Sequence, residues 1–204
     1  MELLLGLAVL IYSAILHEIA HGFVADRLGD PTARLLGRLT LNPKPHIDPM
    51  MSVFLPLLLM LSGSPIIFGA AKPVPVDPFN LREGRKDMAL VALSGPLTNV
   101  LLAIAAGVIY NIPIALPAEI RLVLFLIVQY NLLLAIFNLI PIPPLDGSKV
   151  FSILLSEEQA VRFQSIGSMG IFILFFLLLF PIGPFRLGEI IFRLVHAGLT
   201  ALGF

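Results

Sequence analysis

Two histidines four residues apart carry the most specific chemical signal in the sequence. Residues 17–21 read H-E-I-A-H, an H-E-x-x-H pattern. Positions four apart on a helix lie on one face, so the imidazoles of His17 and His21 can bind one zinc ion. Glu18 lies beside them and can take the proton of a water that the metal activates. The pattern therefore predicts a zinc hydrolase with Glu18 as its general base.

A third metal ligand must come from elsewhere, because a catalytic zinc takes three protein ligands and keeps one position open for water. The chain has no cysteine, so thiolate ligands are excluded. The side chains near apolar segments that qualify are His46, Asp48, Asp77 and Asp146. We choose Asp146 because it follows a long apolar run and a Pro-rich break, and such breaks are tolerated where they line a cavity. The alternative for Asp146 is a solvated turn, since Asp-Gly is a common turn pair.

The composition indicates that this chemistry lies within a membrane protein. Of the 204 residues, 58% are apolar and 13% are charged, whereas a soluble domain has about 45–50% apolar and about 25% charged residues. Ionisable residues inside apolar helices are costly and usually mark function. The 13 basic and 13 acidic side chains cancel, which gives no case for a nucleic-acid partner. We therefore expect a multi-pass protein of the cell membrane that is solvated by the lipid bilayer.

Apolar runs and their breakers predict the elements that position these residues. A spanning helix needs about 20 mainly apolar residues. The candidate runs are 3–25, 49–71, 88–110, 120–140 and 166–182. The tail at 185–204 is either a sixth span or an interfacial helix. Together they predict an all-α polytopic membrane protein with about five to six transmembrane helices.

Two shorter segments depart from this helical pattern, and one further short helix is expected. Residues 32–41 alternate loosely and predict a strand or hairpin. The prolines between 72 and 78 predict an extended segment, and a short helix is expected to end near residue 155. We thus expect a short β hairpin or strand region near the active site.

Four motifs resemble those of the site-2 proteases, which are intramembrane zinc metalloproteases. They are H-E-I-A-H at 17–21, F-G-A-A-K-P-V-P-V at 68–76, S-G-P-L-T-N at 94–99 and N-L-I-P-I-P-P-L-D-G at 138–147. The resemblance covers most of the chain, from the first helix to about residue 150. It implies hydrolysis of single-span transmembrane protein substrates, with Glu18 as general base. It also implies one Zn²⁺ per chain, held by His17, His21 and Asp146.

The resemblance further implies that Asn138 assists catalysis by hydrogen bonding at the scissile carbonyl or to the substrate backbone. Asn131 lies seven residues earlier on the same face, and we interpret it as interhelical glue. His46 either packs its loop, or serves as a fourth ligand or as an acid for the leaving amine. The chain resembles a minimal form without PDZ-like or nucleotide-sensing domains. It is expected to form one domain, 1–204, with a core at 1–150 and C-terminal helices at 151–204.

The ligand positions constrain the topology. His21 lies near the end of the first helix and Asp146 lies past the end of the 120–140 helix, so both helices must point the same way. A return helix at 88–110 satisfies this, and a further span at 49–71 would place Asp146 on the opposite side. We therefore expect 49–71 to be re-entrant. The segment 72–76 then lies beside the zinc, either as an edge that pairs with an unwound substrate or as a Pro-stiffened loop.

Two other functions fit part of the pattern. A metal-ion transporter or channel could use the same His and Asp side chains as a transit site, but a transit site needs no general base beside the first histidine. An inactive relative acting as a membrane binding protein is the second alternative, and the intact H-E-x-x-H motif argues against it.

Overall fold

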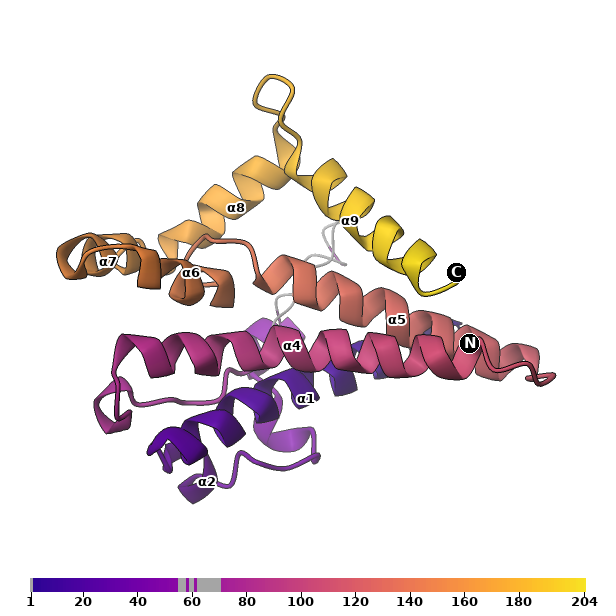
Figure 1. Ribbon diagram of the computed structural model, residues 1–204, viewed down its shortest axis with the longest axis horizontal. Helices are drawn as coiled ribbons and strands as arrows, with labels where there is room; N and C mark the ends of the chain where they lie inside the picture. The colour runs from indigo at the N-terminus through magenta and orange to yellow at the C-terminus, as the bar shows by residue number, and fades with distance from the viewer. Residues whose placement is uncertain (1, 55–57, 59–60, 62–70) are drawn as a thin grey trace.

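Three long helices form the centre of the molecule. The computed structural model describes residues 2–54, 58, 61 and 71–204. The long helices are α1 (Glu2–Leu28), α4 (Arg85–Tyr110) and α5 (Ala118–Asn138). Each pair of them packs together, and Figure 1 shows α1 and α5 running in one direction and α4 in the other. This is the arrangement that the ligand positions predict.

Shorter elements surround these helices. They are α2 (Thr32–Leu35), η1 (Lys44–His46), η2 (Pro49–Phe54), η3 (Pro78–Asn80), α6 (Asp146–Phe151), η4 (Ser152–Leu154), α7 (Glu157–Gln164), α8 (Met169–Leu179) and α9 (Leu187–Ala201). Helix α6 packs against α4, and α9 packs against α5 and α8. Figure 1 shows α8 and α9 as two arms that meet at a hairpin above α5. The short helix expected before residue 155 is confirmed as α6 and η4.

The described residues contain three helices that are long and apolar enough to cross a membrane, at Leu4–Leu28, Arg85–Tyr110 and Ala118–Asn138. Helices α7 and α8 add a fourth candidate if the pair, bent by 73°, counts as one span. Helix α8 has only 11 residues and α9 has 15, or about 16 and 22 Å at 1.5 Å per residue, against about 30 Å of hydrocarbon. The all-α architecture is thus confirmed, whereas five to six spans are not.

The predicted β region is not confirmed. Apart from one bridge between Ile182 and Phe185, no strand pairing occurs in the part of the chain that the structure describes. The predicted strand at 32–41 begins instead with helix α2, because the side chain of Asp30 accepts the N–H of Thr32 and starts a helical turn. The expected re-entry of 49–71 falls mostly on residues outside the described ones.

Asp30 ties the segment after residue 76 to the end of α1. Its carboxylate is fully buried and accepts hydrogen bonds from the backbone of Asp77 at 2.7 Å and from the amide of Asn80 at 3.0 Å. Burial alone raises the pKa of Asp30, but these bonds and those from Thr32 outweigh burial and hold the pKa below its ordinary value. The charged carboxylate therefore fixes where residues 71–77, which form neither helix nor strand, pass along α1.

Candidate metal centre

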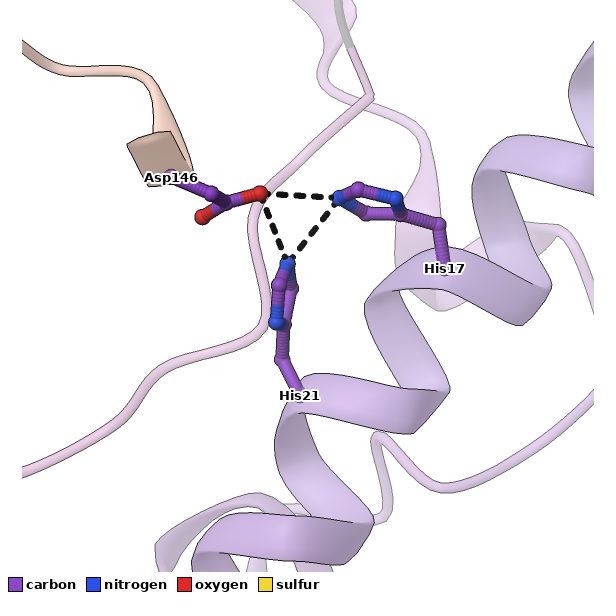
Figure 2. A group of neighbouring side chains, drawn as sticks. All are labelled: His17, His21 and Asp146. Carbon is purple, nitrogen blue, oxygen red and sulfur yellow. Dashed lines mark hydrogen bonds and ion pairs between the residues drawn. The ribbon is translucent and has the colours of Figure 1, made fainter. Parts of the chain in front are cut away.

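Three side chains meet where α1 faces the start of α6. His17 and His21 lie one turn apart on α1, and Asp146 reaches them from the first turn of α6 (Figure 2). The Oδ2 atom of Asp146 lies 3.1 Å from Nε2 of His17 and 3.2 Å from Nε2 of His21. The two Nε2 atoms are 3.0 Å apart. All three side chains are buried, and the structure thus brings together the predicted ligand set.

In both imidazoles the nitrogen that faces away from Asp146, Nδ1, forms a hydrogen bond. Nδ1 of His17 lies 2.6 Å from Oδ1 of Asn99, and Nδ1 of His21 lies 2.7 Å from the carbonyl oxygen of Val91. These oxygens accept, so each Nδ1 donates its proton. Each Nε2 then presents a lone pair toward Asp146.

This donor set fits a metal ion. Three lone-pair atoms facing one another at 3.0, 3.1 and 3.2 Å need a proton or a metal ion among them, because they otherwise repel. Bonds of about 2.0–2.1 Å to a tetrahedral zinc place its ligand atoms about 3.3 Å apart. Two neutral imidazoles and one carboxylate are also ligands that zinc takes in catalytic sites.

The chain must turn sharply to deliver Asp146. Gly147 lets the first turn of α6 approach the backbone at the end of α5, because a Cβ there would overlap the carbonyl of Leu139. The second carboxylate oxygen, Oδ1, lies 3.5 Å from Nζ of Lys149. Asp146 therefore presents one oxygen to the imidazoles and the other to a partly exposed cation.

Glu18 follows His17 directly in sequence but is not one of the group of three side chains. Its Oε2 accepts a hydrogen bond of 2.6 Å from the backbone N–H of Val74. The guanidinium of Arg38 donates to the carbonyls of Lys72 and Pro73 at 2.8 and 3.2 Å. The segment 72–74 is thus held beside α1 by side chains rather than by a neighbouring strand.

The other predicted candidates lie outside the group. Nε2 of His46 donates to the carbonyl of Thr40, and its backbone carbonyl accepts from Lys72, so His46 packs the loop. Asp77 accepts from the N–H of Phe79. Neither joins His17, His21 and Asp146 among the described residues that could hold a metal. The side-chain amide of Asn138 donates to the carbonyl of Leu134, one turn earlier in α5.

Comparison with known proteins identifies the family. The model of peptidase family M50 matches residues 112–180. Over 202 residues the chain is 33% identical to "Putative zinc metalloprotease YwhC" of Bacillus subtilis, covering 95% of this chain and 86% of that one. The chain belongs to peptidase family M50. It is a zinc metalloprotease, and the predicted relation to the site-2 proteases is confirmed.

Mycobacterial relatives of this M50 peptidase carry a similar name. This chain is 34% identical over 177 residues to "Putative zinc metalloprotease Rip2" of Mycobacterium tuberculosis. The aligned region covers 84% of this chain and 64% of that one. The chain is 29% identical over 182 residues to the Rip2 of Mycolicibacterium smegmatis, with 87% and 68% covered. No solved structure matches the chain.

Sequence reasoning missed two residues of α4 that contact the histidines, Gly95 and Asn99. A Cβ on Gly95 would lie 2.6 Å from Cε1 and Nε2 of His17 and 2.6 Å from Cε1 of His21. Asn99 accepts from His17. The two residues are four apart, so helical periodicity places them on one face of α4, and this was the available signal.

Gly95→Ala is expected to weaken zinc binding by the M50 peptidase, because the new methyl group pushes both imidazole rings away from their present positions. Gly107→Ala is the matched control. It replaces a glycine of the same helix with the same gain in helix propensity, and its Cβ meets nothing closer than Leu202 at 3.2 Å. Competition with a chromophoric chelator measures both affinities. Equal zinc affinity in the two variants would contradict the steric argument.

Proposed function

We propose that this zinc metalloprotease is a multi-pass membrane protein that cuts single-span transmembrane proteins inside the bilayer. One observation carries the proposal. The buried His17 and His21 belong to a helix, Leu4–Leu28, that is long and apolar enough to span a membrane. His21 lies seven residues before Leu28, or about 10 Å from that end of the helix. A bond cut there lies below the membrane surface.

The residues divide the work between binding and proton transfer. His17, His21 and Asp146 hold the zinc. Bound there, zinc polarises the scissile carbonyl and lowers the pKa of a water molecule. Glu18 takes the proton of the attacking water and passes it to the leaving amine. The N–H of Val74 orients one oxygen of Glu18 and leaves the other for the proton.

The extended segment beside Glu18 is suited to hold an unwound substrate. A helical substrate has its carbonyls hydrogen-bonded and covered, so it must unwind before hydrolysis. The carbonyls of Lys72 and Pro73 are already engaged by Arg38, and the N–H of Val74 by Glu18. Strand addition by substrate therefore uses the backbone that follows, at 74–76.

Cleavage of defined peptides tests the proposal. The purified protein is incubated in liposomes with single-span peptides, and mass spectrometry locates the cut. We expect cuts within the apolar segment that stop on removal of zinc by a chelator and resume on its return. The control peptide has the same flanks and a polar central segment. Cuts confined to the polar flanks would contradict intramembrane proteolysis.

Asn138→Ala is expected to lower turnover by about 10²–10³-fold with unchanged zinc content, because a donor aimed at the developing oxyanion is worth that much. One of its two N–H groups donates to Leu134 and the other is left for substrate. Asn138→Asp should be at least as harmful, since a carboxylate repels the oxyanion. Turnover and thermal stability are measured on one preparation. Loss of stability with activity retained would mean that Asn138 only supports α5.

A further inference from the structure

A chain of buried amides links the metal centre to the core of the three-helix bundle. Asn99 of α4 and Asn131 of α5 are both fully buried. Oδ1 of Asn99 lies 2.6 Å from Nδ1 of His17, and Nδ2 of Asn99 donates to Oδ1 of Asn131 at 2.8 Å. Nδ2 of Asn131 donates to the carbonyl of Ile127 and to the hydroxyl of Ser13, each at 2.8 Å. The chain thus joins α5, α4 and α1 and ends on a zinc-binding ring.

Backbone carbonyls fix the direction of every bond in this chain. The carbonyl of Ile127 can only accept, so the amide of Asn131 must turn its nitrogen there and its oxygen toward Asn99. Asn99 must then present its nitrogen to Asn131 and its oxygen to His17. The carbonyl of Ser13, 3.4 Å from Nδ2 of Asn99, requires the same orientation. A reversed amide would leave a buried donor facing a donor, which is costly.

We propose that Asn99 is a positioning residue, held by Asn131, that sets which nitrogen of His17 binds zinc. The inference rests on the zinc site of the proposed function. Because Asn99 offers only an oxygen to His17, the ring proton stays on Nδ1 and the lone pair of Nε2 points at the metal. Hydrogen bonding of the second ring nitrogen also fixes the ring orientation and raises ligand basicity. The backbone carbonyl of Val91 accepts from Nδ1 of His21 in the same way and so holds the ring proton of His21 on Nδ1. Because this acceptor belongs to the backbone, no side-chain substitution removes it.

The plainer interpretation is that both amides only glue the helices together. The two interpretations differ in which property each variant changes. If Asn99 and Asn131 only hold the helices together, replacing either one lowers the stability of the bundle to a similar degree. Positioning acts on zinc through the acceptor of Asn99 and depends on Asn131 only indirectly, since Ser13 also orients Asn99.

The test compares zinc affinity, by chelator competition, with thermal stability of the zinc-free protein. Asn99→Leu should weaken zinc binding by roughly 10–100-fold, the usual effect of losing such a partner. Asn131→Leu should destabilise the bundle to a similar degree with a smaller loss of zinc affinity. Asn99→Asp should bind zinc at least as tightly as wild type, because its carboxyl accepts from His17 whether protonated or not.

Specific outcomes decide the question. The inference is overturned if Asn99→Leu binds zinc like wild type, or if zinc affinity falls in step with stability across both Leu variants. It is overturned as well if Asn99→Asp binds zinc tenfold or more weakly than wild type, a measurement that stands even if Asn99→Leu does not fold. Wild-type protein without zinc affinity would overturn the proposed site itself, so the two failures are distinguishable.

Discussion

Replacing Glu18 with glutamine is expected to lower the rate of peptide cleavage by about 10²–10⁴-fold, the usual contribution of a general base, and to leave zinc bound. The side chain keeps its size, and its amide oxygen still accepts the N–H of Val74. The neutral amide, however, cannot take a proton from water. Zinc remains because the three side chains that meet at the site are His17, His21 and Asp146.

Zinc content and turnover are measured on the same preparation of the Glu18→Gln variant. Glu119→Gln is the control, because Glu119 is exposed in the first turn of α5 and should behave like wild type. Turnover near the wild-type value removes Glu18 from the mechanism. Loss of zinc would instead mean that Glu18 supports the metal site. The same experiment separates a protease from a metal transporter, since a transit site has no use for a general base.

The local part of the site was predictable from the sequence. His17 and His21 share a face because helical geometry alone places residues four apart together. Asp146, in contrast, lies 129 residues from His17 in sequence, so local helical geometry does not predict their contact. The Pro-rich break after a long apolar run favoured Asp146 over His46, Asp48 and Asp77, but a solvated turn at Asp146 stayed open until the family resemblance was added. The parallel course of α1 and α5 followed from the same choice.

The parts that sequence reasoning missed depend on contacts between elements. The spacing of Gly95 and Asn99 puts both on one face of α4, but it does not show that two imidazoles of another helix occupy the space beside Gly95. Sequence reasoning interprets Asn131 as interhelical glue, but its partner Asn99 and the link through Asn99 to His17 could be identified only once the helices were packed together. The predicted strand at 32–41 failed because the Asp30 side chain favours a helical turn at Thr32, a local competition that a loose alternation does not reveal.

Asp146→Ala is expected to empty the metal centre and abolish cleavage together. Two imidazoles remain, and a catalytic zinc takes three protein ligands. The carboxylate also supplies the only negative charge among the three ligand groups, so its loss removes the strongest attraction for a divalent cation. Metal analysis after dialysis should fall from about one zinc per chain toward none.

The control for Asp146→Ala is a second buried aspartate in the first turn of a helix. Asp87 of α4 is as buried as Asp146 and accepts the backbone N–H of Glu83 at 2.8 Å, but it does not belong to the metal group. Asp87→Ala should lower thermal stability and keep zinc. Asp146→Ala should lose zinc instead, and thermal stability is compared on the zinc-free proteins, so that the stabilisation lost with the metal does not enter the comparison. Full zinc occupancy after Asp146→Ala would place the third ligand elsewhere and overturn the site assignment.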